Sequence, residues 1–370
     1  MGNNKKDWIV NTELIKVGNA EIERNDEKTL AAIERAGRII REGGLVAFPT
    51  ETVYGLGGDA LNPESARKIY AAKGRPSDNP LIVHIAELDA LRGIASDVPE
   101  EAYLLAEKFW PGPLTMILKK TDAVPLATTG GLDTVAVRMP AHKVALAFIR
   151  AGGGYIAAPS ANTSGRPSPT LASYVAEDMN GRIELILDGG PVGIGLESTI
   201  VDLTVNPPQL LRPGYITREM LSEVLGEVNV DATILHSTEE CGQAPKAPGM
   251  KYRHYAPKGE LLIVRGNPLE VAKYINECAG RDAQKGEKVG VIATLEELSS
   301  YRADVVKSVG SRTDEESIAR ELYRILREFD DEGVTRIYSE AFDSDGLGQA
   351  IMNRLLKAAG HHVVDLRNGT

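Results

Sequence analysis

Short apolar segments alternate with helical patterns along most of the chain. Residues 28–42 carry apolar side chains at helical spacing, and Gly43 and Gly44 end this pattern before the apolar strand LVAFPT. Further strands read PLIVHI, LTMILK, TVAVRMP, YIAAPS, ELILDG and STIVDL, with helices expected over 63–72, 99–109 and 142–151. Near-continuous apolar strands between helices are typical of an α/β domain with a largely buried sheet. We expect this domain to span residues 27–228.

The alternation stops in the stretch 237–259, which reads STEECGQAPKAPGMKYRHYAPKG. Its prolines and glycines cannot continue a helix or a central strand, so residues 229–259 are predicted to be a linker. A second alternation follows over residues 260–370. Its strands read LLIVRG, KVGVIA, ADVVKSVG, VTRIYSEAF and HHVVDL, with helices expected near 267–279, 294–300, 314–329 and 348–359. This pattern predicts a small doubly wound parallel sheet, and the absence of GxGxxG after its first strand gives no support to a dinucleotide site.

Composition excludes several classes of protein. The two cysteines, Cys241 and Cys278, are far apart and have no metal-binding spacing, so a disulfide framework or zinc site is not expected and a reducing cytoplasm fits. No apolar run approaches the ~18 residues of a membrane span, and the first residues lack a signal-peptide core. A net charge of −10 opposes a surface that binds nucleic acid as a whole, although a local basic cleft is compatible with it.

Five polar or glycine-rich loops flank the strands of the first domain. They read FPTETVYGLGGDA, KGRPSDNPLIVH, GGLDTVAVRMP, APSANTSGRPS, and GIGLESTIVD with LLRPG. Together they supply the cations Lys73, Arg75, Arg138, Arg166 and Arg212. Arginine offers paired donors that suit carboxylates and phosphates, and glycine lets backbone N–H groups approach an anion closely. Because ligands of open α/β sheets lie beyond strand ends, where such loops converge, we expect a pocket for an anionic ligand with several phosphates.

Each loop alone also has a purely structural interpretation. Lys73 and Arg75 fit the basic end of a helix followed by a solvated loop, and His84 fits a hydrogen-bonded core histidine. Turn or capping roles would suit further polar residues, Thr50, Thr52, Ser160 and Asn162. Arg138 is harder to explain in this way, because an arginine that ends an apolar strand needs a partner if it is buried. The occurrence of all five loops in one chain favours the site.

The loop sequences, together with WPGPLTMIL, resemble the YrdC-type threonylcarbamoyl-AMP synthases. The proline-rich linker and the ending GLGQAIMNRLLKAA resemble the two-domain branch of that family. The resemblance covers residues 27–366, and no motif position is missing. It implies a YrdC-like twisted open sheet, joined through the linker to a small Rossmann-like parallel-sheet domain at the C-terminus.

The resemblance also implies an activity. These enzymes join L-threonine, bicarbonate and ATP into L-threonylcarbamoyladenylate and release pyrophosphate. A downstream tRNA threonylcarbamoyltransferase then passes the threonylcarbamoyl group to an adenosine beside the tRNA anticodon, so direct tRNA binding is not required here. Carboxylate, carbamate and triphosphate repel one another, and cations, backbone N–H groups and the Mg²⁺ carried with ATP would offset that repulsion. No covalent nucleophile is needed, and no metal ligands on the protein are expected.

Site residues follow from the resemblance position by position. The threonine pocket would comprise Thr52, His84, Arg138, Ala158 and Ser198, with Arg138 on the amino-acid carboxylate. The nucleotide side would comprise Lys73, Arg75, Asn79, Thr134, Ser160, Asn162, Ser168 and Arg212. Lys73 and Arg75 would face the phosphates and are the expected catalytic residues.

The linker carries more chemistry than a passive spacer needs. The stretch PGMKYRHYAPKG places two tyrosines, a histidine and several cations between prolines. We hypothesise that it closes over the pocket as a lid, with Tyr255, assigned to the nucleotide side, and His254 closing on bound ATP or threonine. A lid would protect a carbamoyl adenylate from hydrolysis. A solvated tether is the alternative.

The C-terminal domain gives no functional signal of its own. Ile351 and Leu355 are predicted to face its core, while Asn353 and Arg354 are expected to be solvated. Acidic residues at 314–316 are expected to begin a helix and complement its dipole. A different class of function, an RNA-binding module that holds double-stranded RNA on a concave basic surface, remains an alternative for the first domain. Carbamoyl-transfer enzymes that share the YrdC-like fold are a further alternative, disfavoured because their zinc-finger cysteines are absent here.

Overall fold

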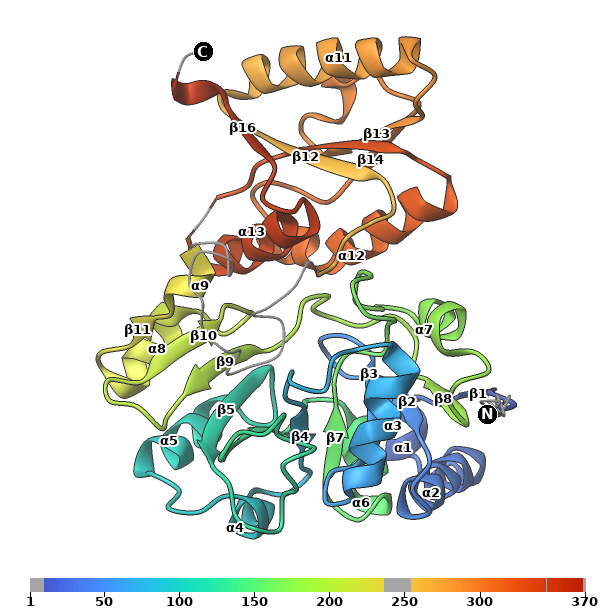
Figure 1. Ribbon diagram of the computed structural model, residues 1–370, viewed down its shortest axis with the longest axis vertical. Helices are drawn as coiled ribbons and strands as arrows, with labels where there is room; N and C mark the ends of the chain where they lie inside the picture. The colour runs from blue at the N-terminus through green and yellow to red at the C-terminus, as the bar shows by residue number, and fades with distance from the viewer. Residues whose placement is uncertain (1–9, 236–253, 344, 369–370) are drawn as a thin grey trace, which may run out of the picture.

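The strands of the protein form two sheets, seen in Figure 1. The computed structural model describes residues 10–235, 254–343 and 345–368. The larger sheet has 11 strands in the order β1-β8-β2-β3-β7-β4-β6-β5-β9-β10-β11, and the smaller has five in the order β14-β13-β15-β12-β16. The expected α/β class, with a large sheet followed by a small parallel one, is confirmed.

The larger sheet is mixed, with parallel and antiparallel pairs. Its strands are β1 (Glu13–Lys16), β2 (Val46–Phe48), β3 (Gly55–Asp59), β4 (Ile82–His84), β5 (Leu114–Lys119), β6 (Thr134–Arg138), β7 (Ile156–Ala158), β8 (Leu185–Asp188), β9 (Thr199–Asp202), β10 (Gln209–Arg212) and β11 (Asn229–Val230). β1 pairs with β8, and β11 pairs with β10. The sheet therefore extends beyond the expected range 27–228 on both sides, and residues 229–235 form β11 and a short helix instead of the start of a linker.

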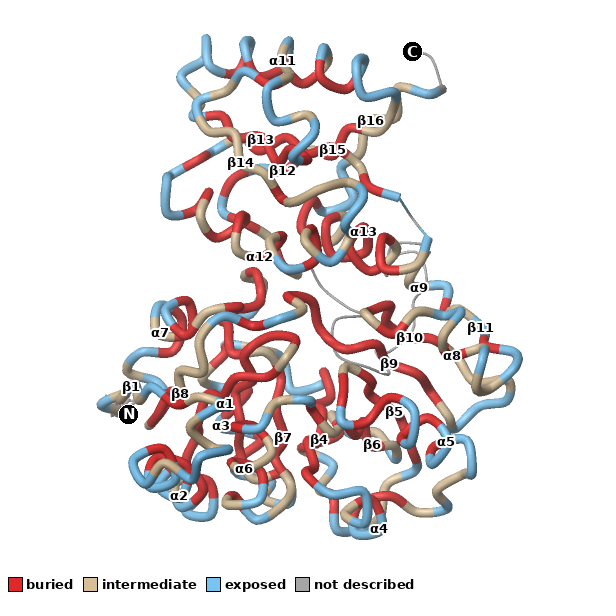
Figure 2. Tube along the Cα trace, turned by 180° about the vertical axis from the view of Figure 1, so that it is seen from behind, coloured by how far each residue is buried: buried red, intermediate tan, exposed pale blue. Residues whose placement is uncertain are grey.

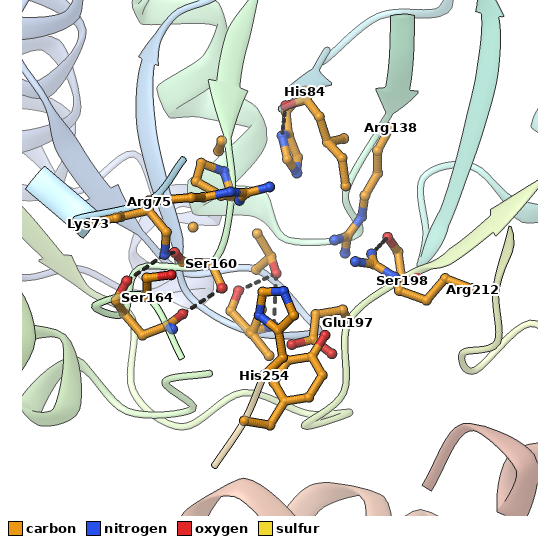
Figure 3. A pocket seen from close by; sticks show the side chains of 18 of the residues that line it. Lys73, Arg75, His84, Arg138, Ser160, Ser164, Glu197, Ser198, Arg212 and His254 are labelled. Carbon is orange, nitrogen blue, oxygen red and sulfur yellow. Dashed lines mark hydrogen bonds between the residues drawn. The ribbon is translucent and has the colours of Figure 1, made fainter. Parts of the chain in front are cut away.

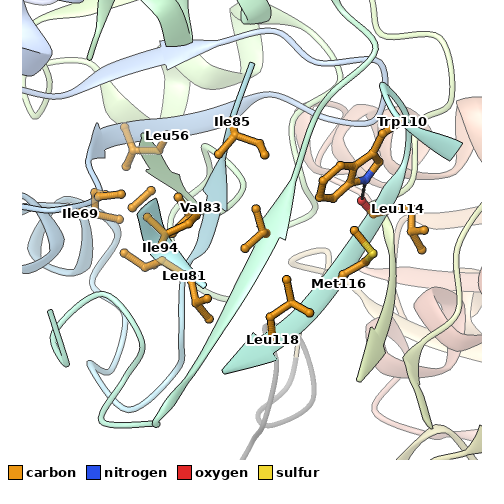
Figure 4. Close-up of a cluster of buried hydrophobic side chains, with 14 of the residues drawn as sticks. Leu56, Ile69, Leu81, Val83, Ile85, Ile94, Trp110, Leu114, Met116 and Leu118 are labelled. Atoms are coloured by element: carbon orange, nitrogen blue, oxygen red, sulfur yellow. Dashed lines mark hydrogen bonds between the residues drawn. The ribbon is translucent and has the colours of Figure 1, made fainter. Parts of the chain in front are cut away.

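Helices cover both faces of this sheet. They are α1 (Asn19–Glu23), α2 (Glu27–Arg41), α3 (Pro63–Lys73), α4 (Leu91–Ile94), α5 (Glu100–Phe109), α6 (Lys143–Ala151), α7 (Ala172–Met179), α8 (Arg218–Leu225) and α9 (Ala232–Leu235), with a 3-10 turn η1 (Leu88–Ala90). One buried cluster packs α2 and α6 against the sheet, and a larger one lies under α3 and α5. Figure 4 shows part of the larger cluster, including Ile69, Val83 and Met116.

Local sequence explains where α3 begins and ends. The side chain of Asn62 accepts a hydrogen bond from the Glu64 N–H, and Pro63 occupies the first turn, where no backbone donor is required. Gly74 ends the helix with φ at 63°, a left-handed conformation that costs glycine little. This turn directs the chain from Lys73 into the loop that carries Arg75.

The smaller sheet is entirely parallel, as the strand–helix alternation predicted. Its strands are β12 (Glu260–Arg265), β13 (Val289–Ala293), β14 (Val305–Ser308), β15 (Arg336–Glu340) and β16 (Val363–Asp365). Its helices are α11 (Pro268–Gln284), α12 (Glu315–Asp331) and α13 (Gly346–Ala358), with 3-10 turns η2 (Leu298–Ser300) and η3 (Leu366–Asn368). The helix expected over 294–300 is wrong. Only η2 forms there, because the backbone bonds are of the tighter 3-10 kind, from the Glu297 N–H to Thr294 and from the Ser300 N–H to Glu297.

Helices α12 and α13 lie between the smaller sheet and the first domain, whereas α11 covers the opposite face (Figure 1). Figure 2 shows buried segments of both helices. Asp314 caps α12, and Ile351 and Leu355 are fully buried, as expected. The expectation that Asn353 and Arg354 are solvated is wrong, since both are buried. For Arg354 the reason is a contact with the first domain. No helix within the described ranges is long and apolar enough to cross a membrane.

Candidate active site

One cavity in the first domain collects residues from the expected loops (Figure 3). Ten of the predicted site residues line it: Lys73, Arg75, His84, Arg138, Ala158, Ser160, Asn162, Ser198, Arg212 and Tyr255. They come from α3 and the loop after it, from the ends of β4, β6, β7 and β10, from the loop before β9, and from the segment before β12. Chain segments that are distant in sequence therefore converge on one concave site.

The other predicted residues lie behind the cavity wall or away from it. Thr52 is buried and contacts Arg138, while the backbone carbonyl of Asn79 accepts from Arg75. Ser168 donates to Glu197, which itself lines the cavity. Thr134 begins β6 and Arg138 ends it, so about 13 Å of extended strand separates them. The structure does not bring Thr134 to the cavity, and its nucleotide contact stays a prediction.

The Arg138 guanidinium is buried and has partners in the first loop. It lies opposite His84 in the parallel β4–β6 register. Its Nη1 donates to Thr52 Oγ1 at 2.9 Å, and its Nη2 is 2.7 Å from Glu51 Oε1. Glu51 is thus the partner that a buried arginine requires, and the pair orients the guanidinium at the cavity wall.

His84 fits both roles expected from the sequence, a hydrogen-bonded core histidine and a residue of the threonine pocket. Its Nδ1 lies 3.1 Å from the carbonyl oxygen of Ile82, and its ring meets Phe48 edge-on, as in a core histidine. It also lines the cavity beside Arg138. Burial, followed by the charge of Arg138, lowers the pKa of His84 to about 3, so the imidazole is neutral near pH 7. A neutral ring can donate or accept a hydrogen bond but does not act as a general acid near pH 7.

Lys73 ends α3 and is buried, whereas Arg75, two residues later, is half-buried in the loop after the helix. Lys73 Nζ donates to the backbone carbonyls of Ser160 and Asn162. Burial lowers the pKa of Lys73 well below its ordinary value and that of Arg75 to about 10. Arg75 Nη2 donates to the carbonyls of Asn79 and Pro80 at 3.2 and 3.3 Å.

Within the described part of the chain, no carboxylate lies within ion-pair distance of Lys73 or Arg75. A buried cation without a counter-ion is unfavourable. The pair therefore fits a cavity whose anion arrives as a ligand.

The remaining polar groups form a network along the cavity wall. Ser160 Oγ donates to Asn162 Oδ1 at 2.5 Å. Arg212 donates to the carbonyl and the hydroxyl of Ser198 at 2.9 and 3.1 Å, and burial lowers the pKa of Arg212 to about 10. The hydroxyl of Ser198 also lies 2.7 Å from that of Thr115.

Sequence analysis missed Glu197, although it lies inside the quoted stretch GLESTIVD. This carboxylate lines the cavity and accepts from Ser168 Oγ at 2.5 Å, from Tyr323 OH at 2.9 Å and from Arg354 Nε at 3.1 Å. Burial acts to raise the pKa of Glu197, but Arg354 and then Arg212 outweigh it and hold the pKa below its ordinary value. The only sequence signal was a charged residue directly before a predicted pocket serine.

Tyr255 lies in the cavity wall, and its ring centroid is 5.1 Å from that of Tyr323 on α12. The next residue, Ala256, is anchored by a backbone hydrogen bond to Gly165. Lys251 and Arg253, which the lid hypothesis also used, lie outside the described residues. Closure of this segment over a ligand stays a prediction.

The described residues contain no group of three or more His, Cys, Asp or Glu side chains arranged to hold a metal ion. The cations that line the cavity suit the oxygens of a phosphate.

Comparisons with known proteins place the chain among close relatives. Residues 38–214 match the Sua5/YciO/YrdC family model, described as telomere recombination, and residues 216–360 match that of the threonylcarbamoyl-AMP synthase C-terminal domain. A threonylcarbamoyl-AMP synthase of Pyrococcus abyssi is 51% identical over 332 residues, covering 90% of this chain and 95% of the relative. One from Bacillus subtilis is 50% identical over 345 residues, covering 93% of this chain and 96% of the relative.

Solved structures agree. The crystal structure of Sua5 from P. abyssi complexed with L-threonine has a TM-score of 0.86 and 46% identity, covering 97% of this chain and 99% of that one. A P. abyssi Sua5 variant with a histidine and a tyrosine replaced by alanine has a TM-score of 0.88 and 47% identity, covering 96% and 98%. Both matches extend over the two sheets.

Proposed function

Since the chain belongs to the threonylcarbamoyl-AMP synthase family, an enzyme family of the nucleotidyltransferase type, we propose that it joins L-threonine, bicarbonate and ATP into L-threonylcarbamoyladenylate and releases pyrophosphate. The observation that carries the proposal is the pair Lys73 and Arg75, one buried and one half-buried, which line one cavity and have no carboxylate partner among the described residues. Such a site suits a polyanion. The L-threonine complex of the P. abyssi relative supports the amino-acid half.

The reaction is a condensation followed by an adenylyl transfer. The amine of threonine attacks the carbon of bicarbonate, and loss of water leaves a carbamate. A carbamate oxygen then attacks the α-phosphorus of ATP, and the bond to the β-phosphate oxygen breaks. Pyrophosphate leaves with that electron pair. Bicarbonate, the carbamate and ATP are anions and threonine carries a carboxylate, so the protein must hold negatively charged groups together.

On the threonine side, Arg138 would bind the amino-acid carboxylate. The Glu51 carboxylate and Thr52 hydroxyl hold its guanidinium in place before substrate arrives. Ser198 would contact a polar group of threonine, and neutral His84 adds no charge beside the ammonium. Ala158, with 2% of its surface exposed, would face the threonine methyl group.

On the nucleotide side, Lys73, Arg75 and Arg212 would face the phosphates, with Ser160 and Asn162 beside them. Asn79 and Ser168 lie behind the cavity wall and would act indirectly. The Asn79 carbonyl accepts a hydrogen bond from Arg75, and Ser168 donates one to Glu197. Arginine donors match phosphate oxygens in pairs, and lysine supplies a compact charge. Mg²⁺ would enter with ATP as part of the substrate and neutralise charge on the departing pyrophosphate.

The product is a mixed anhydride and must be consumed soon after release. We propose that a tRNA threonylcarbamoyltransferase takes it to form N6-threonylcarbamoyladenosine in tRNA, in the cytoplasm. The first step needs no RNA, so direct tRNA binding is not required of this chain.

An omission experiment tests the proposal. Purified protein receives MgATP, threonine and bicarbonate without tRNA, and pyrophosphate release is followed while each substrate is left out in turn. We expect release to need all three. Release that does not depend on threonine, or no release at all, would contradict the proposal. Tight binding of double-stranded RNA by a protein that releases no pyrophosphate would favour the RNA-binding alternative.

A further inference from the structure

The C-terminal domain inserts two arginines into the first domain, one from each of the helices that face it. Arg327 on α12 and Arg354 on α13 are both fully buried. Arg327 donates to the carbonyl oxygen of Pro167 at 2.6 Å and pairs with Asp178 at 2.8 Å. Arg354 reaches the loop that carries Glu197. No sequence pattern indicates a role for this domain, so these contacts bear on its function directly.

Arg354 joins two separate segments of the cavity wall. Its Nε donates to Glu197 Oε2 at 3.1 Å, and its Nη2 to the backbone carbonyl of Glu197 at 3.4 Å. Its Nη1 donates to the carbonyl of Pro213. Glu197 directly precedes Ser198, and Pro213 directly follows Arg212. One guanidinium therefore fixes the neighbours of both a threonine-side and a nucleotide-side residue.

The Glu197 carboxylate receives most of its hydrogen bonds from the C-terminal domain. Tyr323 on α12 and Arg354 on α13 both donate to it, and Ser168 is the donor from the first domain. The ring of Tyr323 also stacks near Tyr255 in the cavity wall. Without α12 and α13, a buried carboxylate in this wall would lose two of these three donors, which is unfavourable.

We propose that Arg354, assisted by Tyr323, is a positioning residue of the active site, and that the C-terminal domain thereby belongs to the catalytic unit. It acts by holding Glu197 as an ionised, fully hydrogen-bonded part of the cavity wall. This orients Ser198 and Arg212 toward their ligands. The inference rests on the proposed function and adds to it a task for the second domain.

A positioning role differs from simple docking of two domains, and Arg327 provides the matched comparison. It is as buried as Arg354 and bridges the same interface, but its partners are Pro167, Asp178 and, at 3.8 Å, Glu177, and it makes no ion pair with Glu197 among the described residues. Loss of either arginine should weaken the interface. Only loss of Arg354 leaves the Glu197 carboxylate without its charged partner.

A positioning role and a docking role also differ in how the activity of a variant should depend on pH. The groups around Glu197 are Arg354 and Lys357 of α13, Tyr323 of α12, Arg212 of β10, Ser168 and Tyr255. Removing Arg354 removes the largest influence that lowers the pKa of Glu197, so burial would raise it. Glu197 would then bind a proton as the pH falls, and activity would decline on the acid side.

The test compares Arg354→Met, Arg354→Lys and Tyr323→Phe with Arg327→Met in the full-length protein. Circular dichroism and thermal unfolding first establish that each variant is folded. We expect Arg354→Met to lower kcat/KM for threonine about 10–100-fold and to show an acid limb that the wild type lacks. Arg354→Lys should restore part of the rate. Arg327→Met should lower the melting temperature without adding that limb.

Tyr323→Phe and one double variant keep the test decisive. Tyr323→Phe removes only a hydroxyl, so it should fold even if Arg354→Met does not, and it should lower kcat/KM about tenfold. The double variant Glu197→Gln with Arg354→Met should be no worse than Glu197→Gln alone, because the two residues act as one unit.

Folded Arg354→Met and Tyr323→Phe proteins with wild-type kcat/KM and pH profile would overturn the inference while leaving the proposed function intact. A wild-type protein that makes no adenylate would refute the proposed function itself, and this inference with it.

Discussion

The Nη1 of Arg138 donates a hydrogen bond of 2.9 Å to the hydroxyl of Thr52, joining the end of β6 to the loop that follows β2. Both side chains are buried, and Glu51 pairs with the same guanidinium. The planar group is therefore held before threonine binds, and the fork of donors can match a carboxylate.

Arg138→Lys should accordingly raise the KM for threonine more than it lowers kcat. Lysine keeps the charge but cannot donate to Thr52 and to a carboxylate in the same plane. Steady-state kinetics with threonine as the varied substrate measure this. An unchanged KM for threonine in a folded Arg138→Lys protein would remove Arg138 from the carboxylate site.

Arg75→Ala should strongly impair adenylate formation. The loss of one charge-assisted donor in a desolvated site costs about 2–4 kcal/mol, so kcat/KM for ATP should fall about 30- to 1000-fold. Arg67→Ala is the control, since Arg67 lies on the same α3 with its side chain 64% exposed and pairs only with Glu64. Equal turnover by the two variants would place Arg75 outside the site.

Threonine should be selected over serine mainly through its methyl group. A methyl contact in a small apolar pocket gives about 10–200-fold discrimination, so serine should be a poor substrate and not an excluded one. Ala158→Gly should reduce the ratio of the two kcat/KM values by removing the contact on the protein side. The placement of Ala158 fails if the wild type uses both amino acids equally well, or if the glycine variant keeps the full ratio.

ATP binding should be accompanied by proton uptake at Lys73. Burial holds the pKa of Lys73 well below its ordinary value in the empty cavity, and bound phosphates would raise it again. Affinity for ATP should therefore weaken as the pH rises above the pKa of the empty state. Calorimetry in buffers of different ionisation enthalpy detects the uptake.

Lys73→Arg is the matched control for that measurement, because an arginine stays charged throughout the range and should remove the proton uptake. Heats that do not depend on the buffer in the wild-type protein would contradict the assignment of Lys73 to the phosphates.

Tyr255→Ala should reduce synthesis more than Tyr255→Phe. The ring of Tyr255 packs near Tyr323 and forms part of the cavity wall, while phenylalanine retains that packing. The measurement is adenylate formation together with the fraction of product lost to hydrolysis. A fully active Tyr255→Ala protein, with no extra hydrolysis, would support the tether alternative for the linker.

The parts of the fold that the sequence predicts are those with local causes. Apolar strands and the helical pattern that ends at Gly43 depend on neighbours a few residues away, and the structure agrees with them. The segment 294–300 forms only a 3-10 turn, and its first residue is held by Glu340, which lies 46 positions later. A contact of that range leaves no periodic signal.

The candidate site shows the same difference between residues with local signals and residues with long-range partners. Its loops could be recognised because each carries cations, hydroxyls and glycines in a compact motif. Arg354 could not, because a charged side chain on a helix is exposed by default and its partner Glu197 lies 157 positions away. Glu197 was missed for the same reason, since nothing beside it in sequence indicates the arginine that neutralises it.

The most direct test of the proposed function is the composition of the product. The protein would be incubated with labelled threonine, labelled bicarbonate and ATP labelled at the α-phosphorus, each label being distinguishable, and the nucleotide product would be separated rapidly at low temperature. We predict one species that contains all three labels in equal amounts, formed together with an equal amount of pyrophosphate. A nucleotide product without the bicarbonate label, or one without threonine, would contradict threonylcarbamoyladenylate synthesis by this chain.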